Sequence, residues 1–172
     1  MAMTPRLRKF ALTIHVTSSV GWLGVVVSYL ALVVAAMTSQ NTQMGRSVWI
    51  AMELIGWYVI VPLAIASLVT GLVMSLGTQW GLFRHYWVLF KLLLTIIATS
   101  VLLQTMPTVS FLAGVVAESD SINLVGLQSQ LLHAGGGLFV LLVTTILSVY
   151  KPRGMTLYGQ RKHQMKSTNN SG

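Results

Sequence analysis

The amino-terminal part of the sequence contains a long uncharged stretch, FALTIHVTSSVGWLGVVVSYLALVVAAM (residues 10–37). Asp, Glu, Lys and Arg are absent from residue 10 to residue 45, and they are equally absent from residues 54–83, 92–117 and 121–150. A helix that crosses a membrane needs about 20 apolar residues. Each run is therefore long enough for one such helix and too short for two helices with a loop between them.

These runs predict an all-α fold, a polytopic membrane protein whose four transmembrane helices form an up-down bundle. We expect the helices at about residues 10–37, 48–76, 86–107 and 128–150. They form one membrane domain over residues 10–150, with a basic tail before it (1–9) and a basic, mobile tail after it (151–172). The first run is far longer than the apolar region of a signal peptide, so we expect the first helix to be retained.

The composition excludes several classes of protein. Apolar residues make up 54% of the chain and charged residues only 8%, whereas soluble domains carry about 25% charged residues. Cysteine is absent, which excludes disulfide scaffolds, thiol redox enzymes and iron–sulfur proteins. The net charge of +8 is not carried on a polar surface, so nucleic acid is not an expected partner. The lipid bilayer is the expected partner, together with another membrane protein or further copies of the chain.

The basic residues predict the orientation in the membrane. Ten of the eleven Lys and Arg residues lie on one side of the predicted helices: Arg6, Arg8, Lys9, Arg84, Lys91, Lys151, Arg153, Arg161, Lys162 and Lys166. The other side receives Arg46, Glu118 and Asp120. The positive-inside rule then places both termini in the cytoplasm, in a multi-pass protein of the cell's inner (cytoplasmic) membrane.

Each predicted helix has one face of small or polar residues, which we expect to point into the bundle. In chain order, these faces hold His15, Ser18, Ser19, Trp22 and Tyr29; Glu53, Trp57, Ala64, Ser67, Gly71 and Ser75; Trp87, Lys91, Thr95, Ala98, Leu102 and Thr105; and His133, Gly137, Thr144 and Ser148. The stripe Ser67, Gly71 and Ser75 is typical of helices that approach a neighbour closely. Pro62 is expected to kink the second helix.

Ionisable residues at membrane depth are costly, which makes them the first candidates for a functional site. His15 and Lys91, with His85 nearby, are predicted near the cytoplasmic side. Glu53 and His133 are predicted near the outer side. At about 1.5 Å per residue, His15 and His133 would be roughly 15–20 Å apart along the membrane normal, too far for both to bind one haem.

The cytoplasmic group suggests a haem or porphyrin site. Histidine is a common axial ligand of haem iron. Lys91 would be a second ligand if burial removed its proton, or would bind a propionate if charged. Ser18, Ser19 and the small stripe of the second helix would leave space for a flat ring. The alternative is structural: Lys91 extends to the lipid headgroups and His15 bonds to a neighbouring helix.

The outer pair suggests a metal ion or a proton relay. One carboxylate and one imidazole are too few ligands for a closed zinc site, so no metal site is assigned. Met44, Met52 and Met106 lie on the same side, and thioethers suit Cu(I), although methionine also fills apolar packing. A hydrogen bond between Glu53 and His133 that joins the second and fourth helices is the simplest interpretation.

Two sequence motifs resemble known families. HVTSSVGWLG (residues 15–24) and PLAIASLVTGLVMSLGTQWGLFRHYWVLFKLLL (residues 62–94) resemble HemJ-type protoporphyrinogen oxidases and the membrane part of CopD-type copper-resistance proteins. Over about residues 5–162, including AMELIGW and YKPRG, the chain resembles four-helix bacterial membrane proteins of actinomycete type, known as a domain of unknown function. This second resemblance implies a fold and not an activity.

The HemJ-type resemblance implies haem b at His15 and Lys91, because a histidine and a lysine of that family match these positions. The third predicted helix ends VLLQTMP, with Gln104 and Thr105 where such families often carry a histidine, so the resemblance covers the haem site and not catalysis. Three hypotheses therefore remain: a protein that binds haem b or a porphyrin for redox or haem handling, a non-catalytic membrane subunit or scaffold, and a copper or proton pathway at Glu53 and His133. Whether the protein is an enzyme stays open.

Overall fold

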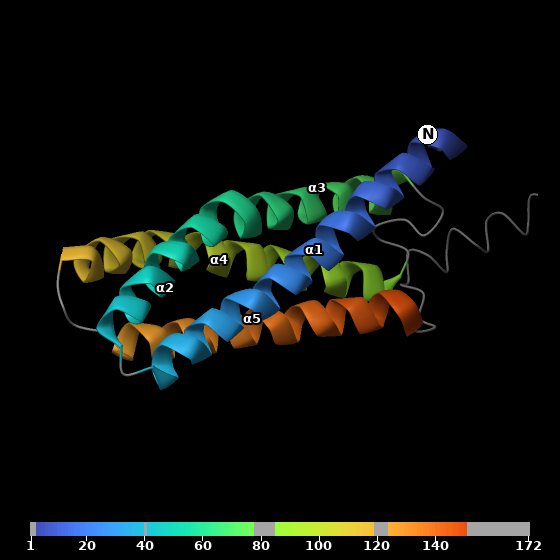
Figure 1. The fold of residues 1–172 in the computed structure, drawn as a ribbon. Helices are drawn as coiled ribbons and strands as arrows, with labels where there is room; N and C mark the ends of the chain where they lie inside the picture. Colours follow the sequence, from blue (N-terminus) through green and yellow to red (C-terminus); the bar gives the residue numbers. More distant parts are fainter. Residues whose placement is uncertain (1–2, 40, 78–84, 119–123, 151–172) are drawn as a thin grey trace, which may run out of the picture.

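A computed structural model describes residues 3–39, 41–77, 85–118 and 124–150; the carboxy-terminal tail predicted to be mobile lies outside them. The elements are α1 (Pro5–Thr38), α2 (Thr42–Ile55), the π-helical turn η1 (Gly56–Ile60), α3 (Val61–Gly77), α4 (Tyr86–Glu118) and α5 (Leu124–Tyr150). Because α2, η1 and α3 form one helix, the described chain contains four helices long and apolar enough to cross a membrane. Consecutive long helices run antiparallel (Figure 1). The predicted all-α fold with four long apolar helices is confirmed.

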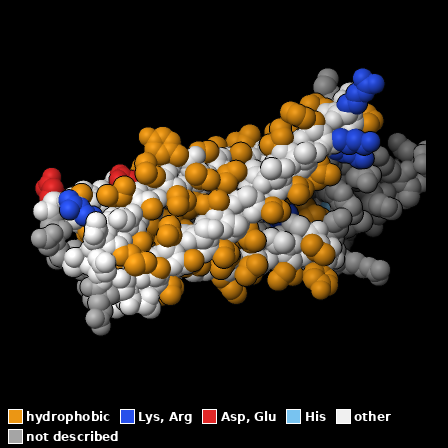
Figure 2. Space-filling view, viewed as in Figure 1, with side chains coloured by type: hydrophobic (Ala, Val, Ile, Leu, Met, Phe, Trp, Pro, Cys, Tyr) orange, Lys and Arg blue, Asp and Glu red, His pale blue; other side chains and the backbone are white. Residues whose placement is uncertain are grey.

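The surface of the bundle has an apolar middle and two charged ends. Figure 2 shows hydrophobic side chains along the visible face, with Lys, Arg, Asp and Glu gathered at its extremities. One end, called here the basic end, carries Arg6, Arg8 and Lys9 at the start of α1. The opposite end, called the far end, carries Arg46 and Glu118. This distribution is that of a four-helix membrane protein, because charges avoid the hydrocarbon interior.

The helix boundaries follow from local chemistry. Pro5 occupies the first turn of α1, where its missing N–H would have no partner in any case. Asn41 caps α2, with its side-chain oxygen accepting hydrogen bonds from the backbone N–H groups of Gln43 and Met44 at 2.9 and 3.4 Å. Such a cap satisfies donors that the first helical turn leaves free, and it allows α2 to begin soon after α1 ends.

The irregularity expected at Pro62 takes the form of the π turn η1. The N–H of Val61 donates to the carbonyl of Gly56, five residues back. Pro62 has no N–H, and in a regular α-helix its ring would clash with the carbonyl of Tyr58. The wider turn directly before the proline accommodates the ring while the helix continues to Gly77.

A second proline, Pro107, lies inside α4 and does not end this helix. The third helix was expected to end at Pro107, but α4 continues to Glu118. A proline removes one backbone hydrogen bond, which membrane helices tolerate when neighbouring helices hold both sides. Here Met106 and Val109 are buried, and the indole Nε1 of Trp57 in η1 donates to Ser110 Oγ at 2.9 Å. Residues 108–118, beyond the predicted end of the third helix, are thus helical.

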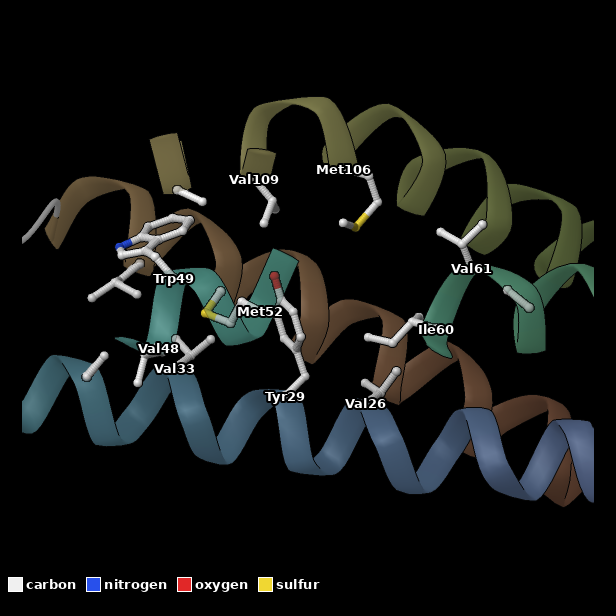
Figure 3. Packing of buried hydrophobic residues seen from close by; sticks show 14 of the residues in the cluster. Val26, Tyr29, Val33, Val48, Trp49, Met52, Ile60, Val61, Met106 and Val109 are labelled. Carbon is white, nitrogen blue, oxygen red and sulfur yellow. The ribbon is translucent and has the colours of Figure 1, made fainter. Parts of the chain in front are cut away.

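The tightest packing lies in the half of the bundle toward the far end. Trp49, Met52, Met106, Val109 and Leu127 are fully buried there. Figure 3 shows Met106 of α4 and Tyr29 of α1 pointing into the same space as Met52 and Ile60. Toward the basic end several of the buried side chains are polar, among them Ser18, Ser67, Thr99 and Thr144. The two halves therefore differ, with an apolar core in one and polar helix contacts in the other.

A buried hydrogen bond joins α1 to α5 within the apolar half. The Tyr29 hydroxyl donates to Gln130 Oε1 at 3.0 Å, and both side chains are buried. Replacing Tyr29 by phenylalanine is expected to lower the free energy of unfolding by about 1 kcal/mol, because the buried Gln130 oxygen loses its donor. Unfolding in mixed micelles with increasing SDS, followed by circular dichroism, measures the change.

The adjacent Ser28 provides the control for this measurement. Its hydroxyl is exposed, and among the described residues it bonds only to the Gly24 carbonyl of its own helix, at 3.1 Å. A Ser28→Ala variant is expected to unfold within about 0.5 kcal/mol of the wild type. Equal midpoints for Tyr29→Phe and Ser28→Ala would contradict a stabilising role for the Tyr29–Gln130 bond.

Candidate functional site

The candidate site begins with the contact between α1 and α3, the most extensive helix contact among the described elements. The stripe predicted for close approach forms it, because Ser67 and Ser75 are buried and Gly71 lies directly against His15. A Cβ at position 71 would lie only 3.1 Å from His15 Cε1. The lack of a side chain on Gly71 is thus what allows the imidazole to fit between the helices.

The hydrogen bonds of His15 fix the position of its proton. Its Nδ1 lies 3.1 Å from the Ser67 carbonyl oxygen and 3.1 Å from Thr70 Oγ1. The Thr70 hydroxyl lies 2.6 Å from the Ala66 carbonyl, to which it donates, so its oxygen is free to accept. A carbonyl only accepts, so a neutral His15 carries its proton on Nδ1 and keeps a lone pair on Nε2. Within the described part of the chain, Nε2 has no hydrogen-bond partner.

This arrangement has the chemistry of a ligating histidine. Metal-bound histidines commonly donate their second ring N–H to a carbonyl or carboxylate, which orients the ring and directs the other nitrogen at the metal. Ser67 supplies such a carbonyl from a different helix, and His15 is half-buried. Sequence reasoning missed Thr70, although it follows Ser67 by three residues and so lies beside the small stripe.

One predicted feature of this site is wrong. The serines of α1 and the small stripe were expected to leave space for a flat ring, but Ser19 Oγ and Ser67 Oγ lie 2.7 Å apart and form a hydrogen bond. The small residues serve close approach of the helices instead of a gap between them. Any ring bound to His15 would therefore lie outside the contact between α1 and α3.

Lys91 is held near the basic end by α4 and α5. Its ammonium donates to Ser148 Oγ, whose own proton is directed at the Thr144 carbonyl 2.7 Å away. The ammonium also lies 5.7 Å from the centroid of the Trp87 ring, within the range of a cation–π interaction. The hydrogen bond uses an N–H donor of the side chain, and the cation–π contact uses its positive charge. Both contacts suit a group that binds an anion better than an amine that ligates iron.

The structure places His15 and Lys91 at the same end of the bundle without a direct bond between them. Facing side chains around them, including Thr70, Thr95 and Ser148, are only partly buried. His85, predicted nearby, forms a tilted ring pair with Trp87 at 6.4 Å between centroids.

The structure does not bring the outer pair together. His133 was expected to face inward but is exposed, and its Nδ1 lies 2.7 Å from the Ser129 carbonyl of its own helix. Glu53 is partly buried on α2. Among the described residues no hydrogen bond joins Glu53 to His133. The inward face of α5 is formed instead by Leu127, Gln130, Leu141 and Thr144.

The described residues contain no group of three or more His, Cys, Asp or Glu side chains that could hold a metal ion. Among the described residues, the site at the basic end therefore consists of the oriented imidazole of His15, the amine of Lys91 and several hydroxyl groups. Comparisons with protein families, with curated proteins and with solved structures give no match to the chain.

Proposed function

We propose that this membrane protein binds haem b or a related porphyrin at its basic end, for redox or haem handling. His15 would be the axial ligand, and Lys91 would bind a propionate. The observation that carries the proposal is the hydrogen bond from His15 Nδ1 to the Ser67 carbonyl, because it leaves Nε2 as the only ring nitrogen with a free lone pair. The same orientation that places both termini in the cytoplasm would put this site near the cytoplasmic surface.

The residues at the basic end fit such a group. A b-type haem needs one or two nitrogen or sulfur ligands, which a single oriented imidazole begins to supply. Its two carboxylates need cations or donors, and the Lys91 side chain is held in position by Ser148 and Trp87. A bound haem supplies one-electron chemistry at iron. This chain's contribution is to orient the ligand, to hold the propionate and to exclude water on the side of α1 and α3.

Absorbance spectroscopy tests the proposal. The protein, purified in detergent without haem, is titrated with haemin, and the Soret band is followed before and after reduction with dithionite. We expect a stoichiometric, saturable Soret shift and sharp α and β bands on reduction. A spectrum no different from that of haemin in detergent alone would reject haem binding.

A substitution of Lys91 distinguishes a residue that binds a propionate from one that ligates the iron. Replacing Lys91 by leucine is expected to weaken haemin binding by about tenfold, because a charge-assisted hydrogen bond to a propionate is lost. The positions of the reduced α and β bands should stay unchanged, because the iron ligands are unaltered. Lys91→Arg should retain most of the affinity, because the guanidinium also binds carboxylates.

A modified haem provides the matched control for this prediction. Haemin dimethyl ester lacks the propionate charges, so it should bind the wild type and Lys91→Leu equally. A change in band positions in Lys91→Leu would instead identify Lys91 as an iron ligand. Equal losses for haemin and its diester would show that the variant disturbs the fold and not the propionate contact.

A further inference from the structure

The exposed face of α4 carries polar side chains at the level where a membrane is most apolar. Ser100, Gln104 and Thr108 recur every four residues, and all three are exposed. Gln104 lies about 27 Å from the start of α4 and about 21 Å from its end, at 1.5 Å per residue. Its side chain is therefore too short to reach either membrane surface, unlike a lysine near a helix end. We call Ser100, Gln104 and Thr108 the polar stripe of α4.

The polar stripe has no partner within the described chain. None of the three side chains forms a hydrogen bond with any described residue, whereas Thr95 and Thr105 of the same helix bond to carbonyls four residues back. A primary amide exposed to hydrocarbon without partners is costly, because lipid tails offer neither donor nor acceptor.

A backbone acceptor lies on the same exposed face. Pro107 is exposed, and it lacks the N–H that would otherwise bond to the Leu103 carbonyl. Leu103 is 40% exposed and directly precedes Gln104. The proline thus gives this face a carbonyl without its usual donor, at the same depth as the amide.

Farther along α4, the same face leaves space for a neighbouring helix. A Cβ at Gly114 would meet nothing within 4 Å, and Phe111 beside it is 69% exposed. Small residues let membrane helices approach closely, and side-chain amides and hydroxyls then bond across the contact. This combination of donors, acceptors and open space is what a helix partner would use.

We infer that α4 packs against α4 of a second copy of this chain through the polar stripe. All copies enter the membrane with the same orientation, so a two-fold axis along the membrane normal brings identical residues to the same depth. The Gln104 amide is both donor and acceptor, so it complements itself, as a lysine or a carboxylate would not. Residues 92–117 carry no charge, so two copies meet there without like-charge repulsion.

A cross-linking experiment tests this interface directly. The chain contains no cysteine, so a single introduced cysteine reports only on itself. Phe111→Cys lies beside the polar stripe, and Phe139→Cys lies on α5 with nearly the same exposure, 68% against 69%. In phosphatidylcholine vesicles treated with a membrane-permeant oxidant, Phe111→Cys is expected to form disulfide-linked dimers and Phe139→Cys is not.

The contribution of Gln104 is measured in the Phe111→Cys background. Adding Gln104→Leu should lower the dimer yield at least about fivefold at the same protein-to-lipid ratio, because the interhelical amide bonds are lost. Adding Gln104→Asn should keep most of it. Because Gln104 is exposed, circular dichroism of both variants should match the wild type.

The other outcomes overturn the inference. Equal yields at positions 111 and 139 would mean that collisions, and not a specific contact, produce the dimers. If Gln104→Leu left the dimer yield undiminished, the polar stripe would not be the cause of dimer formation. No dimer of Phe111→Cys at any density would reject self-association and leave a different membrane protein as the occupant of this face.

Discussion

Haemin is expected to bind a His15→Ala variant at least about 100-fold more weakly than the wild type. The reason is the loss of the only nitrogen that the site orients toward a bound iron. The Ser67 carbonyl and the Thr70 hydroxyl remain in place, but neither is a suitable ligand for haem iron. The dissociation constant is measured from the Soret shift during titration in detergent.

His133 provides a matched control for this prediction. Like His15, it places Nδ1 near a backbone carbonyl, that of Ser129 at 2.7 Å. Unlike His15, it is exposed, lies in the half of the bundle toward the far end and, within the described part of the chain, bonds only to its own helix. His133→Ala should therefore bind haemin as the wild type does. If both variants lost affinity equally, binding would reflect histidines in general and not the proposed site.

Exogenous imidazole separates loss of the ligand from loss of the fold. In His15→Ala the space left by the ring lies against Gly71, and free imidazole can occupy it and coordinate iron. Millimolar imidazole should therefore restore low-spin bands in His15→Ala. If imidazole changed the haem spectrum of this variant no more than it changes that of haemin in detergent alone, the proposed pocket would not exist.

A Gly56→Ala variant is expected to lower the free energy of unfolding by about 2 kcal/mol, because a methyl group is forced into a filled core. A Cβ at position 56 would lie 2.3 Å from Met106 Cε and 2.7 Å from Sδ. Methionine side chains are flexible, but Met106 is only 2% exposed, so its end would have to repack against other core residues. The intrinsic preference of a helix for alanine over glycine, about 1 kcal/mol, offsets part of the cost.

A double-mutant cycle assigns the effect to this contact. Met106→Ala alone should cost about 2–5 kcal/mol by leaving a cavity. The double variant Gly56→Ala, Met106→Ala should cost less than the sum of the two by about 1–2 kcal/mol, because the added methyl group enters vacated space. Gly24→Ala is the control, because a Cβ there meets nothing within 4 Å. If the costs of the two substitutions simply added, the effect of Gly56→Ala would come from the backbone of the π turn and not from contact with Met106.

The long helices could be predicted because charges are excluded from the membrane interior and mark its limits along the chain. The end of the third helix could not be predicted in this way, because a proline in a soluble protein usually stops a helix. Here Pro107 lies between Met106 and Val109, which are both buried in the core. Gln130 was also missed. One glutamine in an apolar helix shows no periodicity, and its partner Tyr29 is 101 residues away in the sequence.

The candidate site was predicted in part. His15 and Lys91 stood out as ionisable residues at membrane depth, and the structure places both near the basic end. The role of the Ser67 carbonyl could not be predicted, because backbone atoms leave no mark in a sequence. His133 was expected inside because polar residues were assumed to face the bundle, but the buried face of α5 follows Leu127, Gln130 and Thr144.

The π turn explains why Trp57 does not lie on the inward face, and it also affects the geometry of the candidate site. A regular helix predicted Trp57 on the inward face, but Trp57 is 39% exposed while Gly56 and Ile60 are buried. A π turn holds one residue more than an α-helical turn, and each residue rotates the following helix by roughly 100°. The segment Gly56–Ile60 therefore sets which face of α3 meets α1. The length of this segment, and not only its composition, keeps Ser67 beside His15. Deleting one residue there would therefore break the hydrogen bond between His15 and the Ser67 carbonyl, several helical turns away.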